Sequence, residues 1–227
     1  MRAYLLARSL KANPALDTTL TAYTPGETLD LLDDPRIQAW HKKAVAALPT
    51  HYQQIVLVPC AKTKPWVGPA SRRSKLYSAY NELRAELPTT CFVTISEPLG
   101  IVPMSAWADF PQYDNPGLFV DDAQRSGMTT QQWLASPFAH CYGLPFDAQA
   151  HEIAIQRLGA VVGEFLRNNA ERKIISVVDN ADKSASTHAQ MLDVAIATTG
   201  VEVERHPKRV AARVSPLPYL RALLQKD

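Results

Sequence analysis

A thiol and two amines follow one short apolar run in this chain of 227 residues. The run, at positions 55–58, is too short for a helix and rich in β-branched residues, so it predicts a buried strand that ends at Pro59. Cys60, Lys62 and Lys64 come next, on a segment whose prolines and glycine exclude a helix. Two ammonium groups near a thiol favour the nucleophilic thiolate. The alternative is a structural cysteine beside two solvated lysines.

Two further apolar runs, at 92–95 and 174–178, end in polar residues in the same way. These polar residues are Ser96 and Glu97 after the first run, and Asp179 and Asn180 after the second. If the strands are parallel neighbours, all these side chains meet at the sheet edge where α/β proteins bind ligands. A thiol, a carboxylate and cations together suit nucleophilic attack on an electrophilic carbon. Glu97 would shuttle a proton there, or else serve only as a loop hydrogen-bond acceptor.

Two groups of residues outside the strand ends are candidates for binding a substrate. Positions 104–122 are irregular and rich in aromatic and acidic residues, which is typical of a substrate loop or of an ordinary ordered loop. This segment includes Tyr113 and Asp114. The second group is basic and suits phosphate contacts or a plain solvated surface: Arg72, Arg73, Lys75, Lys183, Arg209 and Arg213.

Composition bounds the class of protein. The chain is 46% hydrophobic and 20% charged with a net charge of +2, as in an ordinary globular protein, and this charge is too small to identify a nucleic-acid partner. Three widely spaced cysteines argue against a secreted disulfide scaffold. Neither a signal peptide nor an apolar run of membrane-spanning length is found, so we expect a cytoplasmic protein without a membrane partner.

Known cofactor and metal motifs are missing from the sequence. Neither GxGxxG nor GxxxxGK[ST] occurs, so a nucleotide cofactor is not expected. His140, Cys141 and His151 form the only cluster of metal ligands along the chain, and their spacing does not match structural zinc sites. We therefore expect no cofactor and no metal. His188 falls inside an expected helix and is assigned as a surface or structurally satisfied residue.

Alternating strands and helices predict an α/β fold, with a mainly parallel sheet and helices on both faces. Residues 1–50 are expected to form an N-terminal helical cover and residues 51–227 an α/β catalytic domain. A fourth strand is expected at 201–204, before a basic tract and a terminal helix that begins at Pro216.

Three ordered motifs resemble those of a known family. They are Pro59-Cys60-x-x-x-Lys64-Pro65-Trp66, Ser96-x-Pro98-Leu99-Gly100-Ile101-Val102-Pro103 and Phe110-Pro111-x-Tyr113-Asp114. The core domain of archaeosine synthase has PCxxxKPY, SPLG[IL]VP and YP…YD segments in this order. Trp66 stands where that family has tyrosine, and Glu97 is an additional residue within the second motif. In size the chain is closer to the DpdC-type proteins of bacterial DNA-modification clusters, with YaaA-type DNA-binding proteins as wider relatives.

The resemblance implies an activity. Archaeosine synthase acts on the nitrile of 7-cyano-7-deazaguanine in tRNA, and DpdC-type proteins convert this base in DNA to its carboxamide. The implied function is a nitrile hydratase-type reaction on DNA containing 7-cyano-7-deazaguanine, in association with a DNA base-exchange enzyme. Two alternatives remain open: an amidotransferase acting on tRNA, and a non-enzymatic DNA-binding protein.

The implied reaction assigns roles to the candidate residues. Cys60 would attack the nitrile carbon, Lys62 or Lys64 would stabilise the developing charge, and Glu97 or Asp114 would activate water. The base would be flipped out of the duplex to reach this thiol. The residues expected to bind it are Trp66, Ser96, Tyr113, Asp179 and Asn180.

Overall fold

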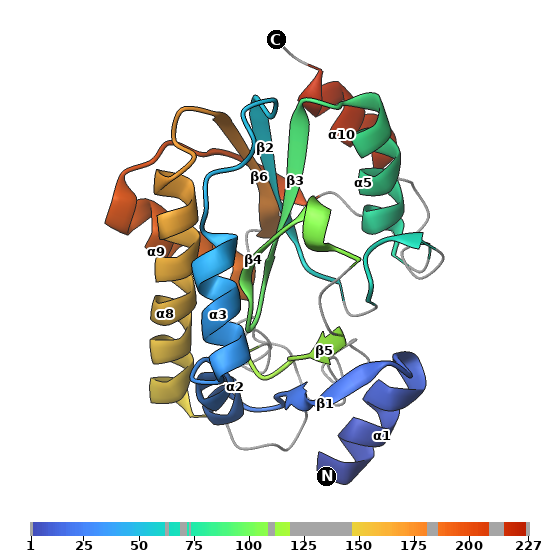
Figure 1. Cartoon of the computed structure of the whole chain (residues 1–227), viewed down its shortest axis with the longest axis vertical. Helices are drawn as coiled ribbons and strands as arrows, with labels where there is room; N and C mark the ends of the chain where they lie inside the picture. The colour runs from blue at the N-terminus through green and yellow to red at the C-terminus, as the bar shows by residue number, and fades with distance from the viewer. Residues whose placement is uncertain are drawn as a thin grey trace.

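The computed structural model describes residues 2–61, 64–68, 72, 74–108, 112–118, 147–180, 186–208 and 216–225. A five-stranded sheet forms its centre (Figure 1). The strands, in spatial order, are β4 (Gly100–Pro103), β3 (Thr90–Ser96), β2 (Gln54–Pro59), β6 (Lys173–Asn180) and β7 (Glu204–Lys208). All neighbours pair in parallel except β3 and β4, which form an antiparallel hairpin. The predicted α/β class with a mainly parallel sheet is confirmed.

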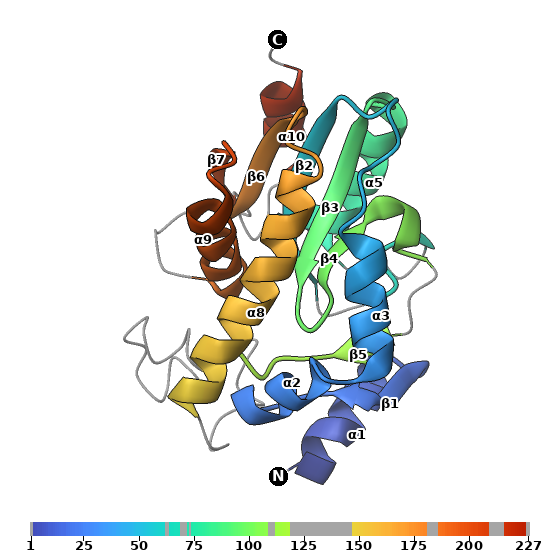
Figure 2. The same ribbon diagram turned by 60° about the vertical axis from the view of Figure 1, so that its left-hand side comes forward.

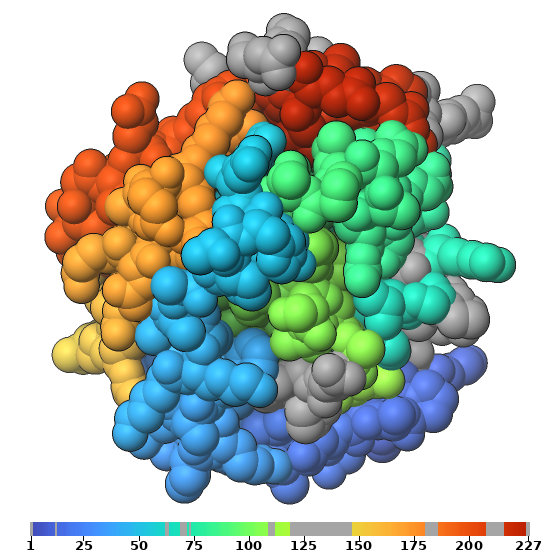
Figure 3. Space-filling model, turned by 45° about the horizontal axis from the view of Figure 1, so that its top comes forward, coloured from blue at the N-terminus to red at the C-terminus, as the bar shows by residue number. Residues whose placement is uncertain are grey.

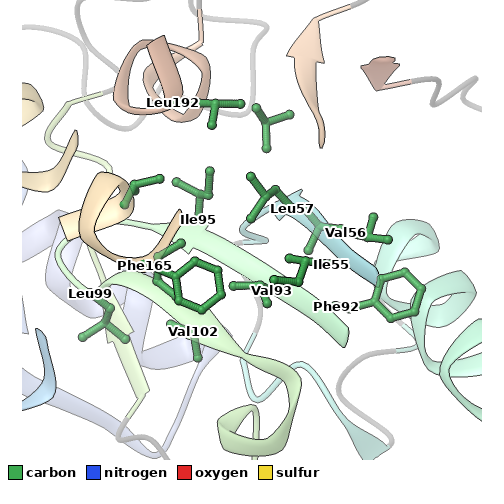
Figure 4. Packing of buried hydrophobic residues seen from close by; sticks show 14 of the residues in the cluster. Ile55, Val56, Leu57, Phe92, Val93, Ile95, Leu99, Val102, Phe165 and Leu192 are labelled. Atoms are coloured by element: carbon green, nitrogen blue, oxygen red, sulfur yellow. The ribbon is translucent and has the colours of Figure 1, made fainter. Parts of the chain in front are cut away.

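The central strands are apolar on both faces because helices cover both sides of the sheet. Val56 pairs with Phe92 and Leu57 with Val93, so successive side chains alternate between the two layers. Figure 4 shows Phe92 beside α5, and Phe165 from α8 on the opposite side, close to Val93. All of these side chains are fully buried, and each such burial contributes about 1.5–3 kcal/mol to folding.

The helices occupy the faces that right-handed crossovers require. The chain moves one way across the sheet from β2 to β3, and the opposite way from β3 to β6 and on to β7. The first crossover therefore places α5 on one face with α10, and the others place α8 and α9 on the other face (Figure 2). The bounds are α5 (Lys75–Glu86), α8 (Ala148–Arg167), α9 (Thr187–Thr199) and α10 (Leu217–Leu224). Ser74 caps α5, Asp147 caps α8 and left-handed Gly200 ends α9.

The segment that connects α3 to β2 lies at the amino end of the sheet. Figure 3 shows it between α8 and the region of α5. Asn169 Oδ1 accepts a hydrogen bond from the Leu48 amide at 2.9 Å, and Arg172 Nη2 donates to the Leu48 carbonyl at 2.8 Å. These bonds join the first fifty residues to the turn between α8 and β6.

The N-terminal region contains a strand as well as helices. It comprises α1 (Arg2–Ala12), β1 (Leu16–Thr21), α2 (Pro25–Leu31) and α3 (Pro35–Ala44). Strand β1 pairs in parallel with β5 (Gln112–Asp114), and this two-stranded sheet lies below the carboxyl ends of β2 and β3 (Figure 1). Only helices were expected here, although the three threonines of β1 favour a strand, because its pairing partner comes from a distant segment.

Two strands differ from the sequence-based expectation. Gly100–Pro103 forms β4, a strand that was not predicted, because this segment folds back onto β3. The last strand is Glu204–Lys208 instead of 201–204, since its bounds follow its pairing with β6. This strand takes part of the expected basic tract into the sheet.

Candidate active site

Cys60 is the first residue after β2, at the carboxyl end of the central strand. Its thiol is free and half-buried. Leu57 to Pro59 pair with the last residues of β3, so the chain leaves both strands at the same level. The predicted position of the thiol at a strand end is therefore confirmed.

Glu97 occupies the turn between β3 and β4, where the Glu97–Pro98 peptide is cis. Gly100 closes the turn with a φ of 67°, and a Cβ added there would lie 2.8 Å from Val161 of α8. His41 of α3 shares a 2.9 Å hydrogen bond with the Pro98 carbonyl. Because the turn is held from both sides, Glu97 is only 1% exposed.

His188 belongs to the first turn of α9. Ser186 caps this helix by accepting a hydrogen bond from the Ala189 amide at 3.1 Å, and its own hydroxyl donates to the Val178 carbonyl at 3.3 Å. The cap thus fixes the start of α9 to strand β6. His188 is 5% exposed. The helix N-terminus, which carries partial positive charge, favours anions at this point.

These three residues come from three different connections and meet in one cluster. Sγ of Cys60, a ring nitrogen of His188 and a carboxylate oxygen of Glu97 all lie within 4.8 Å of one another. His188 Nε2 is 3.5 Å from Glu97 Oε2. We refer to Cys60, Glu97 and His188 as the thiol cluster. The expectation that Cys60 and Glu97 share one edge is confirmed.

The two buried members form an ion pair. Burial would lower the pKa of His188, but the charges of Glu97 and Cys60 outweigh it and raise this pKa to about 10. Burial would raise the pKa of Glu97, yet the charge of His188 and hydrogen bonds from His188 and Thr187 hold it below its ordinary value. At neutral pH the cluster therefore contains an imidazolium and a carboxylate beside Cys60.

Two phenols border the cluster. Tyr113 of β5 shares a 2.5 Å hydrogen bond with Ser96, and Tyr77 of α5 shares one of 2.7 Å with Thr94. Burial raises the pKa of both tyrosines, and negative charge on Cys60 raises it further. Both hydroxyls therefore remain protonated, and that of Tyr77 donates to the Pro59 carbonyl at 3.2 Å. Of the predicted residues, Tyr113 lies near enough to Cys60 to be affected by its charge, and Ser96 is bonded to Tyr113.

Lys64 is held by aromatic rings. Its Nζ lies 4.1 Å from the centroid of Tyr113 and 5.6 Å from that of Trp66, and donates to the Ala61 carbonyl at 3.4 Å. Trp66 is 3% exposed and stacks on Tyr77 with the centroids 5.2 Å apart. The space beside these rings measures about 10 Å³, which is smaller than a nucleobase. In this conformation Trp66 supports the loop after β2 and presents no open face for stacking.

Asp114 lies in a different network. Its carboxylate accepts a hydrogen bond from Ser9 of α1, whose hydroxyl in turn accepts one from Tyr23 at 3.0 Å. The Ala22 amide donates to the Asp114 carbonyl at 3.0 Å. Asp114 therefore joins β5 to the N-terminal region and is not a member of the thiol cluster.

Asp179 is also engaged elsewhere. It pairs with Arg205 of β7, which bonds to Asp193 as well, and both partners are partly exposed. Asn180 ends β6.

Among the basic candidates, Arg72 and Lys75 are exposed beside the start of α5. The other predicted residues lie outside the described part of the chain: Lys62, Arg73, Lys183, Arg209 and Arg213.

His188 was not predicted as a site residue. The expected helix was correct, but its first turn follows β6 and therefore faces the same edge as Cys60 and Glu97. Position within the first turn after a parallel strand is the signal that would have found it. His151, expected in a weak ligand set with His140 and Cys141, is buried in α8, and the other two lie outside the described residues.

Comparisons with known proteins give no relative: no family model, no curated protein and no solved structure matches the chain. Within the described residues, no helix has the length and apolar character needed to cross a membrane. The fold and the thiol cluster together define an α/β protein with a half-buried cysteine beside a buried histidine–glutamate pair at the carboxyl edge of its sheet.

Proposed function

We propose that the protein is a thiol-dependent enzyme that hydrates the nitrile of 7-cyano-7-deazaguanine in DNA to the carboxamide. The observation that supports a thiol mechanism is the cluster itself, in which the free Cys60 stands beside a buried imidazolium–carboxylate pair. A nucleophile, an adjacent acid–base group and a third residue that orients this group are the parts of covalent catalysis. The choice of substrate rests on the motif resemblance described above.

In the first step, the Cys60 thiolate adds to the nitrile carbon. One π bond of the C≡N group breaks, and the nitrogen takes a proton from the His188 imidazolium, which gives a thioimidate. The charge of Glu97 holds His188 protonated and in place before this step. The phenol of Tyr113, which burial keeps protonated, is able to donate a hydrogen bond to developing negative charge.

In the second step, neutral His188 takes a proton from water as the oxygen adds to the thioimidate carbon. The nitrogen receives that proton, and the tetrahedral adduct carries one hydroxyl and one amino group. The hydroxyl proton returns to His188 as the C–S bond breaks, so the carboxamide and the starting thiolate–imidazolium pair are formed together. Glu97 acts here through His188, and water activation moves from the predicted Glu97 or Asp114 to the histidine.

The deciding experiment incubates the protein with a DNA duplex that contains 7-cyano-7-deazaguanine and analyses the nucleosides by mass spectrometry. We expect a product heavier by one water, with the oxygen derived from labelled solvent water. A matched tRNA substrate and added amine donors test the amidotransferase, whose product carries the amine instead. Binding of the modified duplex without any change in base mass would overturn the proposal in favour of a DNA-binding protein.

A further inference from the structure

The atoms of the thiol cluster are spaced like the ligands of one metal ion. Zinc binds thiolate sulfur at about 2.3 Å and imidazole nitrogen or carboxylate oxygen at about 2.0–2.2 Å. Two N/O ligands on one tetrahedral ion are therefore roughly 3.4 Å apart. The separation of 3.5 Å between His188 Nε2 and Glu97 Oε2 fits this value. Sulfur and an N/O ligand on such an ion are roughly 3.6 Å apart, so the remaining distances, all within 4.8 Å, require a contraction of up to about 1.2 Å by the half-buried Cys60.

The three donors also match zinc in chemistry. Thiolate and imidazole favour zinc over hard cations such as Mg²⁺ and Ca²⁺, which prefer all-oxygen sites. Metal binding releases the imidazolium proton of His188, because only the neutral ring coordinates a metal. Thiolate, carboxylate and neutral imidazole then carry two negative charges, so a divalent cation gives a neutral complex. This neutrality matters because Glu97 and His188 are 1% and 5% exposed, and a net charge there would be costly. The two negative ligands also offset the positive N-terminal end of α9.

We propose that Cys60, Glu97 and His188 form a site for one divalent cation of the zinc class, and that its occupation blocks the thiol. Three protein ligands leave a fourth position open to water, as in catalytic zinc sites. Coordination uses the sulfur lone pair that would otherwise attack the nitrile. The proposal that the cation blocks the reaction rests on the proposed function, whereas the proposal that the cation binds does not. Sequence spacing gives no indication of this site, because its ligands are separated by 37 and 91 positions.

Cobalt(II) tests the ligand set directly. The chelator-treated full chain is titrated with Co²⁺, and we expect one equivalent to produce thiolate-to-cobalt absorption in the near ultraviolet and visible d–d bands typical of tetrahedral coordination. Cys60→Ser should abolish the charge-transfer absorption. His188→Asn should weaken Co²⁺ binding by more than the roughly 10–100-fold that is typical when a residue bonded to a metal ligand is lost. Cys91→Ala and Cys141→Ser are matched thiol controls that should keep the full spectrum. Loss of the spectrum in Cys141→Ser instead would overturn the proposed site.

Alkylation of the unmodified protein gives a second test that needs no variant. Iodoacetamide is added with Zn²⁺ alone or with chelator, and labelling of each cysteine is mapped by mass spectrometry. We expect Zn²⁺ to slow labelling of Cys60 at least tenfold, and full nitrile turnover to persist in chelator. Equal Cys60 labelling in both conditions would overturn metal binding and leave the proposed thiol reaction standing. Protection without nitrile turnover by the metal-free protein would support the site while rejecting the proposed function. Activity that requires Zn²⁺ would overturn the inhibitory role.

Discussion

His188 Nε2 lies 3.5 Å from Glu97 Oε2, although 91 positions separate the two residues in the chain. One comes from the first turn of α9 and the other from the β3–β4 hairpin. Both are almost completely buried, and each supplies the charge that keeps the other ionised. Their position beside Cys60 turns an isolated thiol into an arrangement that is able to move protons.

Replacing Cys60 separates chemistry from architecture. Cys60→Ser should remain folded but lose several orders of magnitude in turnover, because a hydroxyl is poorly ionised and the covalent path is removed. Turnover is measured as nitrile-to-amide conversion in the modified duplex. Cys91→Ala serves as the control, since this thiol is buried within β3 outside the cluster. Near-normal turnover in a folded Cys60→Ser protein would exclude the thioimidate.

Replacing His188 tests the residue that the structure adds to the site. His188→Asn keeps a polar side chain but cannot transfer protons, so turnover should fall by about 10²–10⁴-fold. Binding of the modified duplex should change little, so the fall should appear in kcat and not in KM. Both constants are measured for His188→Asn and for the control His206→Asn, which lies on β7. An unchanged kcat in His188→Asn would remove the histidine from the mechanism.

The ion pair should make stability depend on pH. Because the pKa of His188 is raised from 6.5 to about 10 in the folded protein, its contribution is fully present below pH 6.5 and is lost as pH rises through 10. For Glu97, whose pKa is lowered, the contribution is present above its ordinary value of 4.5 and is lost as pH falls through its folded-state pKa. The free energy of unfolding, measured with urea, should fall more between pH 6.5 and pH 10 for the unmodified protein than for His188→Gln. An equal fall in both proteins would contradict the raised pKa of His188.

Replacing Gly100 by alanine should destabilise the protein more than replacing another glycine of the same backbone conformation. Gly100 and Gly200 have φ values of 67° and 68°, so alanine is strained at both by about 1–2 kcal/mol. Only at Gly100 would the new Cβ lie 2.8 Å from Val161 Cγ1, while nothing lies within 4 Å at Gly200. Gly100→Ala should therefore reduce the free energy of unfolding further than Gly200→Ala. It should also reduce turnover, since this turn positions Glu97. Equal costs in urea unfolding would show that α8 does not confine the hairpin.

Asp179 should prove to be structural. Its partly exposed pair with Arg205 predicts a stability loss of about 0–1 kcal/mol for Asp179→Asn and no loss of turnover. Asp179 was expected to bind the base, so the same variant decides between the two roles. A large rise in KM with unchanged unfolding would return it to the substrate site.

Local sequence was sufficient for most of the fold. The short β-branched run before Cys60 and the caps at Thr24, Ser74 and Gly200 act within a few residues, so their effects are visible without a structure. The convergence of Cys60 and Glu97 also followed from sequence, because parallel neighbouring strands bring their carboxyl ends to one edge.

Tertiary structure decided which polar residues share the site. Asp114 and Asp179 carry suitable carboxylates, but Ser9 and Arg205 from distant elements bind them, and no local pattern contains those partners. His188 joins the cluster because α9 begins where β6 ends, next to β2. The charges of the site are likewise a property of the assembled protein. Burial and proximity set the pKa of Glu97 and His188, and both arise only when the hairpin and the helix pack together.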